Sequence, residues 1–278
     1  MCFGAYRKDI KIYKLMNKTL VIAEVGVNHN GSWERGLDLI DAAKFAGADC
    51  VKFQHFNSQR LWGDDRIAHL ELSNNHMLAM KAHADEVGIE FCCTPFGVEE
   101  VEFLTPLVKR WKIASGCLTK WDLLDAVRKT NLPVILSTGM ADIPRIDAAL
   151  AACTTGNTLI SAILLHCTSA YPCPINDVNL AAMDVLRYNF GKSVGYSDHT
   201  AGIVISIAAV AMGATVLEKH LTLDRKAEGP DHKASIEPKD FRVMVDAIRE
   251  IEQAVGKKEK RPQLSEATTI KAWYPDDK

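Results

Sequence analysis

Eight short apolar runs rich in Val and Ile alternate along this sequence with eight longer stretches that have the spacing of amphipathic helices. The runs are TLVIAEVG, DCVKFQ, EFCCTPF, WKIASG, PVILSTG, AILLHCTS, SVGYSDH and TVLEKHLT. The helices are predicted to begin near Glu34, Glu71, Val98, Lys120, Ile143, Asp177, Gly202 and Pro238. Strand–helix pairs in this order imply a parallel sheet with right-handed crossovers. Closing eight of them gives a single (β/α)8 TIM barrel, a fold of about 250 residues. An open doubly wound sheet is the alternative.

The domain boundaries follow from where this alternation starts and stops. The barrel is predicted to take residues 19–256 of the 278-residue chain. Residues 1–18 are charged and have no apolar core of the kind found in signal peptides, so we expect an N-terminal extension. Residues 257–278 are polar and non-periodic, and we expect a C-terminal tail.

The composition excludes several classes of function. The net charge is −2, with 47% hydrophobic and 24% charged residues, which indicates no electrostatic footprint for nucleic acid or a membrane surface. The longest apolar run, residues 201–217, is interrupted by Gly202 and Gly213 and is shorter than the roughly 20 residues of a membrane span. The eight cysteines form no CxxC pair, so we expect reduced thiols in a cytoplasmic protein.

Polar residues gather at the ends of the predicted strands, where TIM barrels carry their functional groups. These residues are Glu24, Lys52, Gln54, Thr94, Lys112, Ser115, Ser137, Thr138, His166, Thr168, Ser169, Ser197, His199, Glu218 and His220. A lone Ser or Thr after a strand is usually a helix cap. Lys52 and Lys112 are different, because two inward-pointing ammonium groups are costly to bury without an anion between them. This pattern favours a small phosphorylated or carboxylated ligand.

His199 and His220 follow the last two predicted strands, and neighbouring strands lie roughly 5 Å apart. Two imidazoles at that spacing can share one divalent ion and leave positions open for water and substrate. A set of only two protein ligands favours an exchangeable ion. In the same turn, SDHT, Asp198 or Thr200 is expected to cap the next helix.

Segments running in order from about Thr19 to Gly256 resemble the sialic acid synthase (N-acetylneuraminate synthase) family. They include VIAEVGVNHNGSW, CTPFGVEEVEFL, LLHCTSAYPCPINDVNL, VGYSDHTAG and LEKHLTLDRKAEGPDHKASIEP. The resemblance implies a TIM-barrel enzyme that condenses phosphoenolpyruvate with an N-acetylated hexosamine, N-acetylmannosamine or a related sugar. The product is a nine-carbon 2-keto-3-deoxy sugar acid, and phosphate is released. The resemblance also implies a homodimer.

The resemblance carries residue roles with it. His199 and His220 are expected to hold a divalent metal ion, usually Mn2+, with Mg2+ or Co2+ as alternatives. The residues expected to bind phosphoenolpyruvate are Lys52, Thr94, Lys112, Ser115, Ser137 and Ser197. Glu24 matches the catalytic carboxylate, and Gln54, Tyr171 and Asp231 match positions on the sugar side.

The chain departs from the family pattern in three respects. The antifreeze-like domain that typical members carry after the barrel is expected to be absent. Cys117 stands where many relatives have Glu, and Ser169-Ala170 stands where sialic acid enzymes often have Asn. Two other functions remain as alternatives: a Schiff-base aldolase or lyase using Lys52 or Lys112, and a catalytically weakened binding protein that needs a partner chain.

Overall fold

The computed structural model describes residues 18–154, 160–256 and 259–274, so the expected N-terminal extension lies outside the described residues except for Lys18. The strands are β1 (Leu20–Gly26), β2 (Cys50–His55), β3 (Glu90–Pro95), β4 (Trp111–Ile113), β5 (Val134–Ser137), β6 (Ala162–His166), β7 (Ser193–Asp198) and β8 (Val216–His220). The α-helices are α1 (Trp33–Phe45), α2 (Ser58–Trp62), α3 (Asn74–Val87), α4 (Val98–Leu104), α5 (Trp121–Lys129), α6 (Ile143–Thr154), α7 (Ala182–Phe190), α8 (Val204–Ala211), α9 (Pro238–Ala254) and α10 (Ala267–Trp273).

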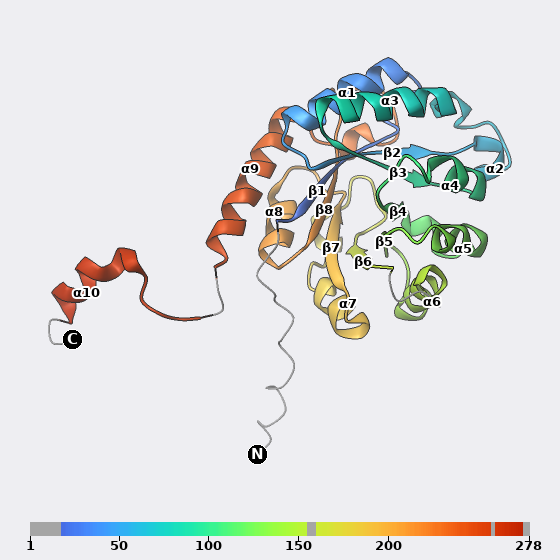
Figure 1. Ribbon diagram of the computed structural model, residues 1–278. Coiled ribbons are helices and arrows are strands. Elements are labelled where there is room, and N and C mark those ends of the chain that lie inside the picture. The colour runs from blue at the N-terminus through green and yellow to red at the C-terminus, as the bar shows by residue number, and fades with distance from the viewer. Residues whose placement is uncertain (1–17, 155–159, 257–258, 275–278) are drawn as a thin grey trace.

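The eight strands form one sheet in the order β3-β2-β1-β8-β7-β6-β5-β4, and each paired neighbour is parallel. The strands lie at the centre of the molecule and the helices surround them (Figure 1). At the seam between β3 and β4, Arg110 Nε donates to Glu90 Oε1 at 2.7 Å. The strand order confirms the predicted (β/α)8 barrel and not the open doubly wound sheet.

Every second side chain of a strand faces the interior of the barrel. These inward-facing side chains form an apolar layer and a polar layer. Six buried residues fill the amino-terminal half of the interior: Ile22, Cys50, Cys92, Ile135, Leu165 and Val216. Two residues further along β1, β2 and β8 come Glu24, Lys52 and Glu218, all buried. The apolar layer therefore forms a floor beneath a charged layer at the carboxyl ends of the strands.

A larger apolar core packs the outer faces of the strands against the helices. It contains Trp111 and Tyr196, both at most 1% exposed, and the indole Nε1 of Trp111 donates to Thr130 Oγ1 at 2.8 Å. The polar atom of the buried Trp111 ring thus has its partner inside the protein. None of the described helices is long and apolar enough to cross a membrane.

Several predicted helix starts are wrong by a few residues. The helix expected near Glu71 begins at Asn74, where the Ser73 side chain accepts from His76 N. The helix expected near Asp177 begins at Ala182. Asn179 adopts a left-handed conformation with φ of 47°, which a right-handed helix cannot include. The short helix α2 was not predicted at all.

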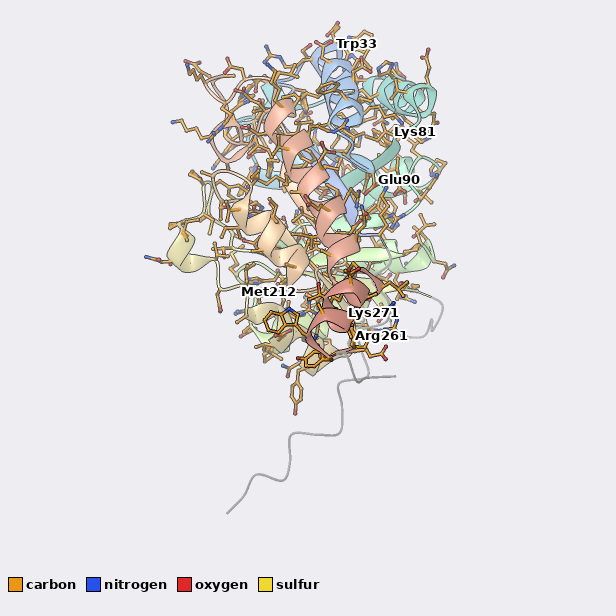
Figure 2. All side chains as sticks on the ribbon, turned by 90° about the vertical axis from the view of Figure 1, so that its left-hand side faces the viewer. Trp33, Lys81, Glu90, Met212, Arg261 and Lys271 are labelled. Atoms are coloured by element: carbon orange, nitrogen blue, oxygen red, sulfur yellow. The ribbon has the colours of Figure 1, made fainter. Side chains whose placement is uncertain are left out.

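One further expectation is corrected. Asp198 and Thr200 do not cap α8, whose N-cap position is taken by Ile203 without a side-chain hydrogen bond. The expected tail contains helix α10, which stands apart from the barrel (Figure 1). In Figure 2, Arg261 and Lys271 lie at the opposite end of the molecule from Trp33, which begins α1.

Candidate active site

One cavity at the carboxyl end of the barrel brings together eleven of the twelve predicted site residues. They are Glu24, Lys52, Gln54, Thr94, Lys112, Ser115, Ser137, Tyr171, Ser197, His199 and His220. The lining is completed by Ala114, Cys167 and Glu218. Because these residues come from all parts of the chain, only the closed barrel makes them neighbours.

The twelfth residue, Asp231, lies beside the cavity and is not part of its lining. Its Oδ2 accepts from Val27 N at 3.5 Å and is 3.9 Å from His220 Nδ1. Burial raises the pKa of this carboxyl. Asp231 therefore borders the histidine side of the cavity.

Lys52 is held by three groups inside the barrel. Its Nζ is 2.7 Å from Glu24 Oε2 and 3.6 Å from Glu218 Oε2, and it donates to Thr94 Oγ1 at 2.9 Å. Burial disfavours the charged form of Lys52, but Glu218 and Glu24 outweigh burial and raise the pKa of Lys52 above its usual value. Gln54 Nε2 donates to the other oxygen of Glu24 at 3.2 Å.

Glu218 is the main site residue that sequence reasoning did not assign to the cavity. Its Oε1 is 3.5 Å from Lys112 Nζ and accepts from Ser197 Oγ at 2.7 Å. Burial favours the neutral acid, but the two lysines prevail and hold the pKa of Glu218 well below its usual range. The signal was present in the sequence, since Glu218 shares a face of its strand with His220.

The positive charges of Lys52 and Lys112 are thus balanced by carboxylates of the protein itself. An anionic ligand was expected between Lys52 and Lys112, and the protein itself supplies the anions Glu24 and Glu218. Burial raises the pKa of Glu24 to about 7; the attraction of Lys52 opposes this rise and repulsion from Glu218 adds to it. An anion that enters the cavity has to share the lysines with these carboxylates.

His199 and His220 face each other with ring centroids 5.7 Å apart. His199 Nδ1 is 2.6 Å from the carbonyl of Thr168, so Nδ1 carries the proton and Nε2 keeps its lone pair. Burial lowers the pKa of His199 to about 4 and that of His220 to about 3. Both rings are therefore neutral near pH 7, the form in which imidazole binds a metal.

The donor set of this pair fits an exchangeable divalent ion. His220 Nδ1 is buried and has no hydrogen-bond partner among the described residues. Across those residues no group of three or more His, Cys, Asp or Glu side chains is arranged to hold a metal. Two imidazoles alone leave most of the coordination sphere to water or a bound ligand.

Tyr171 covers the histidine pair from the open side. Its ring centroid lies 4.1 Å from that of His199 and 5.8 Å from that of His220, while 47% of the residue is exposed. Ser115 Oγ lies 3.1 Å from Ser169 Oγ at the same opening. These groups give the mouth of the cavity an aromatic wall and a hydroxyl wall.

The loop after β1 is tied to the loop that carries Asp231. Asn28 Nδ2 donates to the Leu221 carbonyl and to Ser235 Oγ, each at 2.8 Å, and Ser235 Oγ donates to the carbonyl of Asp231 at 2.7 Å. Asn28 is 1% exposed, so these bonds are shielded from water. They fix the border of the cavity next to His220.

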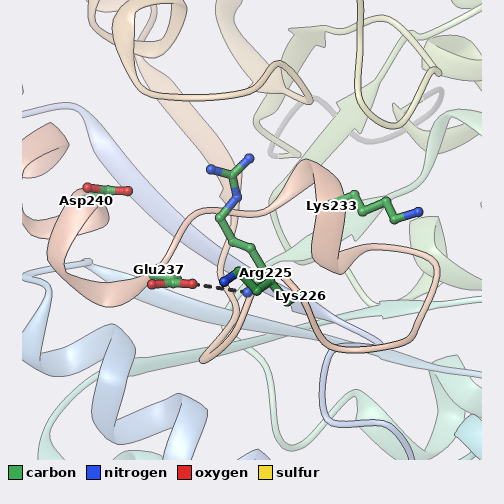
Figure 3. A pocket seen from close by; sticks show the side chains of 5 residues that line it. All are labelled: Arg225, Lys226, Lys233, Glu237 and Asp240. Atoms are coloured by element: carbon green, nitrogen blue, oxygen red, sulfur yellow. Dashed lines mark hydrogen bonds between the residues drawn. The ribbon is translucent and has the colours of Figure 1, made fainter.

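A second pocket contains none of the predicted site residues. It is lined by Arg225, Lys226, Lys233, Glu237 and Asp240, and Arg225 N donates to Glu237 Oε1 at 3.2 Å (Figure 3). Charges of both signs are mixed around this opening, and it lacks a convergent set of buried donors. The barrel cavity is the better candidate for chemistry.

Comparisons with known proteins agree with this fold and cavity. The model of the NeuB family matches residues 39–260. The N,N'-diacetyllegionaminic acid synthase of Campylobacter jejuni is 43% identical over 276 residues, which cover 92% of this chain and 83% of that protein. The N-acetylneuraminate-9-phosphate synthase of Homo sapiens is 36% identical over 256 residues, 85% of this chain and 71% of that one.

Among solved structures, the N-acetylneuraminic acid synthetase of Leptospira borgpetersenii in complex with citrate superposes with a TM-score of 0.87. It is 34% identical in sequence, and the match covers 94% of both chains. The resemblance read from the sequence motifs is confirmed.

Proposed function

The chain belongs to the NeuB family, and from this premise we propose that it condenses phosphoenolpyruvate with an N-acetylated hexosamine. The products are a nine-carbon 2-keto-3-deoxy sugar acid and inorganic phosphate. The observation that carries the proposal is the convergence of two lysines, four serine and threonine hydroxyls, two buried carboxylates and a histidine pair in one cavity.

Lys52 and Lys112 would bind the phosphate and carboxylate groups of phosphoenolpyruvate. The hydroxyls of Thr94, Ser115, Ser137 and Ser197 line the same cavity and would donate to the anionic oxygens. Both lysines are at most 3% exposed, so their attraction for an anion is weakly screened. The two ammonium groups would let a trianionic substrate enter a barrel that already holds two carboxylates.

His199 and His220 would hold the divalent ion, most simply Mn2+. When bound there, the ion supplies Lewis-acid polarisation of the aldehyde oxygen of the open-chain sugar. Tyr171, which lies against both rings, and Gln54 would orient the sugar beside the histidine pair. Asp231 borders this side and would bind a sugar hydroxyl if it turns toward the cavity.

The reaction then forms one carbon–carbon bond and replaces the bond from C2 to the phosphate oxygen with a bond from C2 to the oxygen of water. C3 of phosphoenolpyruvate attacks the sugar aldehyde, whose oxygen takes up a proton, and positive character develops at C2. Water adds at C2 and loses a proton, and the resulting tetrahedral centre expels phosphate to leave the ketone. Glu24 is buried, faces the cavity and is held by Lys52 and Gln54, and it would orient and deprotonate this water.

A Schiff-base aldolase is less well supported by the geometry. Schiff-base formation needs a neutral amine as the nucleophile. Lys52 lies between two carboxylates that raise its pKa and favour its protonated form. Lys112, the other candidate, has its Nζ 3.5 Å from Glu218 Oε1.

The seven cysteines in the described ranges are free thiols, which supports a cytoplasmic location for the enzyme.

The test is phosphate release from phosphoenolpyruvate in the presence of Mn2+ and a panel of N-acetylated hexosamines, phosphorylated and unphosphorylated. The expected release requires both the sugar and the metal and is lost in His199→Ala. The panel identifies the acceptor, since the relatives carry names that refer to several different sugar acids. Phosphate release that is independent of sugar, or equal in His199→Ala, would contradict the proposal.

A further inference from the structure

The last rung of the β7–β8 ladder is a fully buried ion pair. Asp198 and Lys219 are register partners, both are 0% exposed, and Lys219 Nζ lies 3.0 Å from Asp198 Oδ2. The preceding rung on the same outer face pairs Tyr196 with Leu217, and both pack in the apolar core. A charged pair therefore stands where the outer face of these strands is otherwise apolar.

Each charged group of this pair has further partners. Lys219 Nζ donates to the Thr200 carbonyl at 2.6 Å. Asp198 Oδ1 accepts from Thr200 N at 2.8 Å, and Oδ2 accepts from Ser206 Oγ of α8 at 2.5 Å. The pair thus joins β8, the end of β7, the turn after it and the helix that follows.

The ion pair stands directly behind the two histidines. Asp198 immediately precedes His199, and Lys219 immediately precedes His220. His199 and His220 line the cavity and Asp198 and Lys219 do not, because consecutive residues of an extended chain face opposite ways. The spacing of the two rings, 5.7 Å between centroids, is set by backbone that the ion pair ties together.

Stability alone does not explain a charged pair at this position. A buried ion pair is often no more stabilising than well-packed apolar residues of similar volume, because both charges lose their hydration. Hydrogen bonds at fixed distances and angles, unlike apolar contacts, define one arrangement of the strands that carry them. We propose that Asp198 and Lys219 are positioning residues that hold His199 and His220 at the separation needed to share one ligand.

The inference rests on the proposed metal role of the histidines in one respect: the measurement of Mn2+ affinity is informative only if they bind the ion. The test variant is Asp198→Asn/Lys219→Met, which removes both charges together and leaves no lone buried charge. The matched control is Glu90→Gln/Arg110→Met, which removes the cross-strand ion pair near the amino ends of β3 and β4. Three quantities are measured for each: the dissociation constant for Mn2+ by electron paramagnetic resonance of the free ion, the histidine separation in a crystal structure, and the unfolding midpoint.

The test variant is expected to bind Mn2+ about 10- to 100-fold more weakly, as is typical when groups that orient metal ligands are removed. The centroids of its two histidine rings are expected to lie at a distance different from the 5.7 Å of the wild-type protein. Its unfolding midpoint is expected to fall no further than that of the control. The control is expected to bind Mn2+ as the wild-type protein does.

Mn2+ affinity within twofold of wild type, together with unmoved histidines, would overturn the inference. If the wild-type protein binds no Mn2+, the proposed metal role of the histidines fails. The separation of the two histidine rings in the crystal structure of the test variant then decides whether the ion pair positions them. Displaced rings in the test variant then support the positioning role, and unmoved rings overturn it.

Discussion

Glu24 and Lys52 lie opposite each other on β1 and β2 and form a 2.7 Å ion pair in the interior of the barrel. Both residues are 2% exposed, so the pair is shielded from solvent. The proposed base and the proposed anion-binding cation are thus in direct contact. A ligand that binds Lys52 will also alter the surroundings of Glu24.

The first prediction concerns Glu24→Gln. The amide keeps the shape of the side chain, and its single oxygen can accept from Lys52 or from Gln54, but it cannot accept a proton from water. Loss of a positioned general base typically lowers the rate by about 10²- to 10⁴-fold. Phosphate release at saturating substrates measures this effect, with circular dichroism as the folding control. A rate within threefold of wild type would exclude the proposed role.

The second prediction concerns Lys112→Met, in which the cavity loses one of its two buried cations. Hydrogen bonds to charged groups contribute roughly 1.5–3 kcal/mol, so the KM for phosphoenolpyruvate is expected to rise by about tenfold or more. Lys120→Met is the matched control, because Lys120 Nζ donates to the Phe96 carbonyl and does not line the cavity. Equal KM values for the two variants would argue against anion binding by Lys112.

The third prediction concerns His29 and the stability of the fold at low pH. Burial lowers the pKa of His29 to about 4, and Gly31 N donates to its Nδ1, which requires that nitrogen to be unprotonated. The unfolded chain, with a histidine pKa of about 6.5, binds more protons than the folded one between these values. His29 therefore lowers the free energy of unfolding as the pH falls from about 6.5 to about 4.

The variant His29→Asn removes this dependence. The difference in unfolding free energy between pH 7 and pH 5 is expected to be smaller by about 2 kcal/mol in the variant than in the wild-type protein. Urea unfolding at the two pH values measures it. An identical difference for both proteins would show that His29 titrates normally in the fold.

The fourth prediction concerns the packing of β7 against its neighbours. A Cβ at Gly195 would lie 2.3 Å from the Val216 carbonyl oxygen and 2.6 Å from Leu165 Cδ2. Gly195→Ala is expected to lower the unfolding free energy by roughly 1–3 kcal/mol or more, since a backbone atom has to move. Gly116→Ala is the control, because nothing lies within 4 Å of the added methyl. Equal urea midpoints would contradict the close approach.

The sequence predicted the barrel and most of its cavity because both depend on local periodicity. Alternation along β2 and β8 put Lys52 with Gln54, and Glu218 with His220, on the inner face. The ends of strands have a fixed place in this fold, so residues at those positions could be grouped before their distances were known.

The ion pairs inside the barrel could not be predicted in the same way. Glu218 on β8 contacts Lys112 on β4, although β8 pairs with β1 and β7 in the sheet. Contacts across the interior depend on closure of the sheet and on side-chain rotamers, and neither is encoded in local periodicity. The two buried lysines were predicted to need a ligand anion, which was wrong because carboxylates from other strands already lie beside them. The start of a helix differed from its predicted position where a single residue such as Asn179 adopts a conformation that a helix cannot include.

The most direct test of the central claim follows the oxygen that links C2 to phosphorus in phosphoenolpyruvate. The protein is incubated with Mn2+, an N-acetylated hexosamine and phosphoenolpyruvate labelled with 18O at that position, and the released phosphate is analysed by mass spectrometry. Addition of water at C2 predicts that the label leaves with the phosphate, in amounts equal to the sugar acid formed. Unlabelled phosphate, or labelled phosphate formed without the sugar, would contradict the proposed condensation.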